Sequence, residues 1–189
     1  ALTTGSQNTL MGRKAGTSSA SASNQNVFGF AVVSASNDSF TFGHSTTDTT
    51  CSNGGTTWSN PSDARYKENV EDQTAGLSFI NDLRPVTFQW KAENEMPEDH
   101  VVYNADSTKR YMNDTTNHGF LAQEVKEVID NHSEIKDGFD MWSEDDRDGR
   151  QRIGTTALIP ILTKAIQELS AEVEELKQQA HDKCDNKGE

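Results

Sequence analysis

The sequence predicts an α+β domain that follows a short β-rich segment and ends in a long self-associating helix. Residues 1–61 are rich in Ser, Thr, Asn and Gly, with short apolar bursts of strand period. Residues 62–157 mix helical and strand patterns, and residues 158–189 contain a heptad repeat with a polar tail. We therefore expect three parts: the end of a β-rich stalk or fibre, an α+β domain, and a C-terminal helix.

Composition and charge restrict the classes of partner. The chain has 189 residues, of which 32% are hydrophobic and 25% charged, which is typical of one or two small soluble domains. No apolar run is long enough to span a bilayer, so we expect no membrane partner. The formal net charge is -13, and all of it falls on residues 62–189. An acidic chain disfavours nucleic acid, because phosphates attract Lys and Arg patches.

Metal and disulfide chemistry have little support. Cys51 and Cys184 lie on opposite sides of residue 62, so we predict that both are free thiols. The five histidines show no ligand spacing with one another or with cysteine, so we expect neither a metal nor a cofactor. The acidic stretch 143–150 has some features of a calcium loop, but its oxygen ligands are poorly spaced, and we expect a solvated loop.

The first segment contains two apolar bursts, residues 27–33 and 40–43, in which alternate residues share one face. They are too short, and the region has too few apolar side chains, to bury a core alone. The segment is either a disordered linker or the end of a β-rich fibre whose core is completed by other copies. The recurrence of glycine and aromatic residues with the strands favours the fibre.

The α+β domain follows. A helix is predicted over 77–83, where apolar residues recur every third position and Pro85 stops it. Residues 86–90 alternate as a strand, and the polar residues 92–116 indicate a long loop or hairpin insertion. Residues 118–129 have the apolar spacing of an amphipathic helix.

The C-terminal stretch has the clearest periodicity in the chain. Its apolar residues alternate three and four apart over about three heptads. They are Ile159, Leu162, Ile166, Leu169, Val173, Leu176 and Ala180. Such a seam packs against copies of itself, and Glu172 could pair with Lys177 of a parallel chain. The alternative is a single amphipathic helix on its own domain. Ile or Val at a with Leu at d would favour a dimer.

Ser62 and Lys67 are a candidate Ser-Lys pair. A serine hydroxyl becomes a nucleophile when a base, such as a neutral lysine, takes its proton. Free lysine, with a pKa of about 10.4, is almost fully charged at pH 7, so the pair would need desolvation. A separation of five residues places the two on different faces of a helix or strand, so they could meet only across a turn or between chains. Otherwise Ser62 or Asp63 would simply cap a helix.

Four stretches together resemble a known family. They are "SDARYKENV", "GLSFINDLRPVTFQWK", "HGFLAQEV" and "LIPILTKAIQELSAEVEELK", in this order between residues 62 and 177. Together they are similar to the self-cleaving intramolecular chaperone domain of phage tailspikes and tail fibres, the S74 peptidase family. The resemblance spans roughly residues 62 to 180.

The resemblance implies a homotrimer that folds the upstream fibre chain and then cuts itself free. Carried over, Ser62 is the nucleophile, Lys67 the general base and Pro61-Ser62 the scissile bond, with Asp63 as a supporting residue or a helix cap. The cleavage would be a single turnover, in cis or within the trimer. Residues 1–61 would stay in the virion tail fibre, and the chaperone, made in the host cytoplasm, would be released. The trimer expected from the family replaces the dimer favoured by the seam.

Two alternatives stay open. The domain could be a purely structural trimerisation module with a silent Ser-Lys pair. Residues 1–61 could also belong to a receptor-binding tip, so that any host surface receptor would be contacted through the fibre portion alone.

Overall fold

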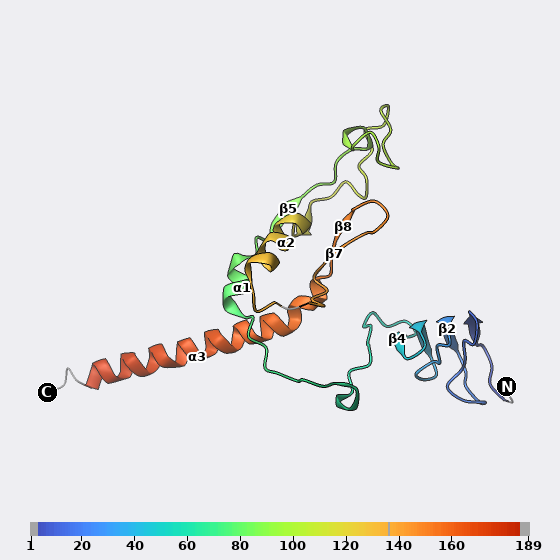
Figure 1. The fold of residues 1–189 in the computed structure, drawn as a ribbon, viewed down its shortest axis with the longest axis horizontal. Coiled ribbons are helices and arrows are strands. Elements are labelled where there is room, and N and C mark those ends of the chain that lie inside the picture. Colours follow the sequence, from blue (N-terminus) through green and yellow to red (C-terminus); the bar gives the residue numbers. More distant parts are fainter. Residues whose placement is uncertain (1–3, 136, 186–189) are drawn as a thin grey trace. The chain divides into compact units, whose positions relative to one another are not determined.

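The computed structural model describes residues 4–135 and 137–185, and the chain divides after Val70 into two compact units (Figure 1). The architecture is mixed α and β, with several small sheets and a C-terminal helix, as the sequence predicts. Ser62 and Lys67 both lie in the first unit. The end of the expected polar tail, 186–189, lies outside the described residues.

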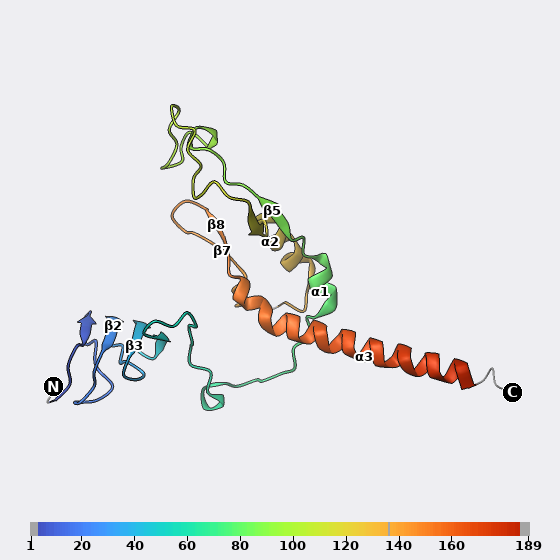
Figure 2. The same ribbon diagram turned by 180° about the vertical axis from the view of Figure 1, so that it is seen from behind.

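The first unit is built on one sheet with the strand order β1-β2-β3-β4 (Figure 2). Its strands are β1 (Thr9–Met11), β2 (Gln25–Phe30), β3 (Ser39–His44) and β4 (Thr47–Ser52). β1, β2 and β3 pair in parallel, whereas β4 returns antiparallel to β3 and forms the edge of the sheet.

The three parallel strands repeat one backbone pattern. Each contains or is followed by a glycine of positive φ, namely Gly12, Gly29 and Gly43. A Cβ at Gly12 would lie 2.1 Å from the Gly29 carbonyl oxygen, and one at Gly29 would lie 1.9 Å from that of Gly43. Only glycine fits this stack, since any side chain would strike the next strand. The glycines that recur in the sequence therefore align the parallel strands.

The two faces of this sheet differ. One face buries Gln25, Val27 and Thr41 completely. The other carries aromatic rings, with Phe28 stacked on Phe40 at 5.1 Å between ring centroids. Several apolar side chains of the unit are exposed, and they include Leu10, Met11, Phe30, Val33, Phe42 and Trp58. The unit thus buries little apolar surface of its own, as its composition predicts.

The second unit has a core at the junction of α1 (Leu77–Asp82), α2 (Ala122–Asn131) and the start of α3 (Leu158–Asp185). Its buried members are Ala75, Phe79, Leu83, Val125, Met141, Leu158 and Ile161. The predicted helix near residue 77 is present, and Phe79 is its fully buried residue. The three-residue apolar spacing missed Phe79, which shares the buried face with Leu83 four positions later.

Two predicted elements are shorter than expected. The strand expected over 86–90 is β5 (Val86–Phe88), which pairs with β6 (Asn117–Gly119). The helix expected over 118–129 is α2, which begins only at Ala122, because His118 and Gly119 belong to β6. The insertion 92–116 contains the 3-10 turn η2 (Glu93–Glu95), and Ala92 bridges Arg110.

The acidic stretch 143–150, expected as a solvated loop, is in part a β-hairpin. β7 (Trp142–Glu144) pairs antiparallel with β8 (Gln151–Ile153), and the acidic residues form the tip. The Asp145 carboxylate accepts hydrogen bonds from the Arg152 guanidinium at 2.6 Å. Arginine therefore occupies the oxygen atoms that a calcium loop would present to the ion.

Helix α3 follows the 3-10 turn η3 (Thr155–Ala157) and has 28 residues. Leu158, Ile161 and Ala165 face the core, and the first part of the helix packs along α1. The second half extends beyond the other elements of the unit in both views (Figures 1 and 2).

The heptad seam lies on another face of α3. Six of its residues are between 40% and 64% exposed: Ile159, Leu162, Ile166, Leu169, Val173 and Leu176. The domain therefore does not use the seam for its own core. Within the described part of the chain, no helix is both long and apolar enough to cross a membrane.

Candidate functional site

The candidate site lies in the segment that follows the four-stranded sheet of the first unit, and it contains the 3-10 turn η1 (Ala64–Tyr66). The Asp63 side chain caps this turn by accepting a hydrogen bond from the Arg65 backbone N–H at 2.9 Å. Aspartate is a preferred N-cap because its short side chain reaches an amide that lacks an internal partner. The turn ends at Lys67, whose backbone returns to an extended conformation.

This turn brings Ser62 and Lys67 together. The Lys67 ammonium donates a hydrogen bond to the Ser62 hydroxyl, with 2.7 Å between Nζ and Oγ. The contact is made across a turn, as the five-residue separation requires. Both side chains are exposed in the single chain. The distance between Nζ and Oγ suits a nucleophile and its base, but both side chains are in contact with solvent.

Asp63 is engaged by Arg65 through its side chain as well as its backbone. The Arg65 guanidinium donates to both carboxylate oxygens at distances of 2.6 to 3.1 Å. Hydrogen bonds from the guanidinium and the backbone of Arg65 lower the pKa of the Asp63 carboxyl, so it stays ionised at neutral pH. The carboxylate thus fixes the turn between Ser62 and Lys67.

The residues just before Pro61 lie along β4. Ser59 and Thr50 exchange two backbone hydrogen bonds, of 2.9 and 3.0 Å. The Thr49 hydroxyl donates to the Asn60 side-chain oxygen at 2.5 Å. Sequence reasoning missed these positions, because the register between the two segments is not encoded in any local pattern.

A cavity of about 570 Å³ lies beside this segment and is lined by Pro61 and Tyr66 together with the β3–β4 turn. Residues 45–48 provide one wall of it. A smaller cavity, of about 370 Å³, is lined by residues 46–49 with Asn60 and Pro61. The residue that would provide the scissile carbonyl is therefore flanked by open space, as the approach of water to that carbonyl requires.

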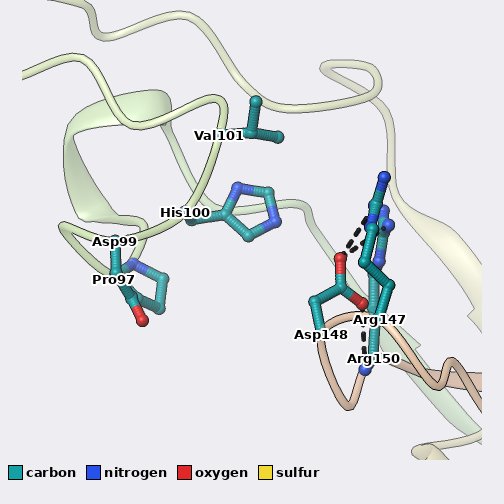
Figure 3. Close-up of a pocket in the computed structure, with 7 residues that line it drawn as sticks. All are labelled: Pro97, Asp99, His100, Val101, Arg147, Asp148 and Arg150. Carbon is teal, nitrogen blue, oxygen red and sulfur yellow. Dashed lines mark hydrogen bonds and ion pairs between the residues drawn. The ribbon is translucent and has the colours of Figure 1, made fainter.

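Another pocket, of about 520 Å³, lies in the second unit between residues 97–101 and the tip of the β7–β8 hairpin (Figure 3). His100 faces it from one side, and Arg147 and Arg150 lie opposite. Both guanidiniums bind the Asp148 carboxylate, at 2.8 and 3.1 Å. Asp99 also lines the pocket, so two carboxylates balance the two guanidiniums and the excess positive charge that an anion site needs is missing.

A metal centre has no support in the described residues, 4–135 and 137–185, where no group of three potential His, Cys, Asp or Glu ligands gathers. Cys51 is a buried free thiol in β4.

Comparison with known proteins gives one match. Residues 62–134 match the S74 peptidase family, described as chaperone of endosialidase. The match begins at Ser62 and includes Asp63 and Lys67. It supports the role of chaperone for a phage tail fibre. No curated protein and no solved structure matches the chain.

Proposed function

From the match of residues 62–134 to the S74 peptidase chaperones, we propose that the chain assembles a trimeric tail fibre and then cuts itself at Pro61-Ser62. The observation that carries the proposal is the 2.7 Å hydrogen bond between Lys67 Nζ and Ser62 Oγ at the start of the matched segment. Residues 1–61 stay with the virion fibre, and any contact with a host surface belongs to them. The remainder is released after assembly.

The proposed reaction is an acyl shift followed by hydrolysis. Ser62 Oγ attacks the carbonyl carbon of Pro61 through a five-membered ring, and Lys67, as the neutral amine, accepts the hydroxyl proton. The bond between the Pro61 carbonyl carbon and the Ser62 nitrogen breaks, and that nitrogen leaves as an amine after receiving a proton from Lys67. Water then hydrolyses the ester, which restores the Ser62 hydroxyl and gives a Pro61 carboxylate. Asp63 acts as a positioning residue, because it holds the turn between nucleophile and base.

Protonation of the lysine controls this step. In the single chain Lys67 is exposed and donates to Ser62, and a donating ammonium cannot accept the hydroxyl proton. Burial disfavours a charged amine, so contact with another copy of the chain would release the proton. We propose that assembly desolvates Lys67 and so permits cleavage after the trimer has formed.

The α3 seam supports the trimer. The seam residues lie beside the face of α3 that is buried in the core, yet they stay 40–64% exposed. Solvent exposure of so long an apolar stripe is unfavourable, whereas burial against other copies contributes about 25 cal/mol for each Å². A trimer held by α3 would also align the chains of the fibre and reduce the entropy lost in their slow pairing.

The test is the intact mass of freshly expressed protein, beside Ser62→Ala, Lys67→Ala and Lys67→Arg. We expect fragments that end at Pro61 and start at Ser62 in the wild type alone. Lys67→Arg is the sharpest variant, because arginine keeps the charge and a donor but stays protonated. Lys91→Ala, which removes a lysine outside the site, should cut like the wild type. Uncut trimer in every lane would instead leave a structural trimerisation module.

A further inference from the structure

The edge of the fibre sheet is occupied by the cleavage segment itself. β4 pairs with β3 on one side, and Ser59 bridges to Thr50 on the other. The two backbone hydrogen bonds between Ser59 and Thr50 make an antiparallel pair of the hydrogen-bonded type. The chain thus adds a short strand-like segment to its own edge strand, which is how many proteases and peptide-binding domains hold an extended peptide.

The register of this pair extends to the scissile bond. Antiparallel pairing of Thr50 with Ser59 places Thr49 opposite Asn60 and Asp48 opposite Pro61. The 2.5 Å hydrogen bond from Thr49 to Asn60 agrees with this register. Asp48 and Pro61 also line both nearby cavities together, which agrees with this register.

Trp58 anchors the other end of the segment. Its ring packs edge-on against Phe42 at 5.4 Å and against Phe40 at 5.8 Å between centroids. Both phenylalanines belong to β3. The docked segment therefore makes ring contacts with β3, and backbone and side-chain hydrogen bonds with β4.

We propose that the folded β3–β4 hairpin of the fibre positions the scissile bond by holding residues 58–60, so that cleavage also waits for the end of the fibre to fold. This inference rests on the proposed autoproteolysis. Thr49 is its central positioning residue: it touches the cleavage segment and takes no part in proton transfer.

The physical reason is orientation. After the scissile bond, the capped turn and the Lys67 hydrogen bond fix Ser62. Before the bond, Pro61 is held through Asn60 and Ser59. With both sides held, Ser62 Oγ meets the Pro61 carbonyl in few orientations, and such restriction accounts for a large part of intramolecular rate enhancement. If the hairpin is unfolded, the residues before the scissile bond are mobile, and cleavage is therefore slow.

The first experiment measures cleavage rates of the full chain by intact mass over time. Thr49→Val removes the hydroxyl donor at nearly constant shape, and we expect cleavage to slow about three- to tenfold. Thr49→Ser keeps the donor and should restore the rate. Ser59→Pro removes the N–H that donates to Thr50, and we expect a loss of at least about tenfold. Thr17→Val, which removes a hydroxyl bonded to the Ser19 carbonyl elsewhere in the unit, is the matched control.

The second measurement is hydrogen exchange of the Ser59 and Thr50 amides in the uncut Ser62→Ala chain. Docking predicts that both amides are protected, and that Ser59→Pro exposes the Thr50 amide without loss of the trimer. If the wild type is cut and the Thr49 and Ser59 variants match its rate, the positioning role is wrong and the autoprotease remains. If the Ser59 amide exchanges as fast as in an unfolded chain, the proposed docking of the segment on β4 is wrong. If the wild type stays uncut although both amides are protected, the proposed autoproteolysis is wrong. The proposed control of cleavage by the hairpin is then wrong too.

Discussion

The His132 imidazole ties the end of α2 to the end of α1. Its side chain is 9% exposed, with Nε2 2.8 Å from the Asp82 carboxylate and Nδ1 2.7 Å from that of Glu134. The hydrogen bond that the imidazole donates to Glu134, and then the one it donates to Asp82, raise the pKa of His132 above its usual range. The same contact with His132 lowers the pKa of Glu134. The charged triad therefore stabilises the folded domain in a limited pH window.

We predict that His132→Gln destabilises the domain more at pH 5.5 than at pH 8.5. A histidine whose pKa is raised by folding stabilises the fold fully below its unfolded pKa of about 6.5, and this stabilisation is lost as the pH rises through the folded pKa. Glu134, with its lowered pKa, acts in the opposite sense and contributes above its unfolded pKa of about 4.3. The window thus runs from about pH 5 to the folded pKa of His132.

The measurement is the free energy of unfolding by urea at both pH values, with the exposed His118→Gln as control. Removing His132 should cost about 1–2 kcal/mol at pH 5.5, because Asp82 is largely exposed and its bond is screened by water. An equal loss at both pH values would mean that the imidazole acts by packing on Phe79 and not by charge.

At the residue scale, contacts between residues close in the sequence were easier to predict than contacts between distant segments. The separation of Ser62 and Lys67 left a turn or a contact between chains as the ways for them to meet, and in the single chain they meet across η1. Thr49 and Asn60 line the same cavity as Pro61, yet their contact was not predictable. Their contact depends on the register of a strand edge, and Thr and Asn are common residues throughout the first segment.

At the scale of elements, α1 depends on α3 for its first turn. The N-cap of α1 is Gly76, which has no side chain to cap the helix. Glu168 of α3 does this instead, because its carboxylate accepts a hydrogen bond from the Leu77 N–H at 2.7 Å. A Cβ at Gly76 would lie 2.4 Å from that carboxylate oxygen, so glycine makes room for a cap from a distant helix.

We predict that Glu168→Ala lowers the stability of the second unit by about 0.5–2 kcal/mol, the usual cost of losing an N-cap. A six-residue helix is not stable alone, so the loss should also loosen the packing of α1 on α3. The check is urea unfolding at one protein concentration, with the exposed Glu175→Ala as the matched carboxylate on the same helix. Glu168→Gln keeps an acceptor and should lose less. Equal stability of the Glu168→Ala and Glu175→Ala variants would contradict the capping role.

Elements were predictable in proportion to their length. The long helix α3 follows from its heptads, and Pro85 correctly ended α1. The hairpin at residues 142–153 was missed, because its strands have three residues each and its charged tip has the composition of a loop. For the same reason β6 was mistaken for the start of α2: three residues are too few to show a period of two.

At the scale of the whole molecule, each unit leaves apolar surface unburied. The first unit exposes Met11, Phe42 and Trp58, and α3 exposes its seam. The seam and the buried residues of α3 lie on neighbouring faces, but the most exposed seam side chains contribute little to the core, so substitutions there should alter assembly without unfolding the domain. A seam variant can therefore show whether cleavage depends on assembly.

We predict that the double variant Ile166→Asp, Val173→Asp remains folded, becomes monomeric and no longer cuts itself. Both side chains are exposed in the single chain, at 62% and 46%, so their loss costs the domain little. Burying such a side chain between copies contributes about 1.5–3 kcal/mol, and a carboxylate in the seam adds a desolvation penalty. Gln167→Asp with Ala171→Asp adds the same charge to exposed positions on the side of α3 away from the seam and should stay trimeric and active.

Sedimentation velocity and intact mass on the same samples check this prediction. We expect the wild type and the control to be trimeric and cut, and the seam variant to be monomeric and uncut. That result would link assembly to the protonation of Lys67. The decisive opposite result is a monomer that cuts as fast as the wild type. In that case the exposed pair at Ser62 and Lys67 would be competent in a single chain, and desolvation by other copies would not be what activates the lysine. A dimer in the wild type would show that Ile and Val at a, with Leu at d, set the oligomer number, as the seam alone predicts.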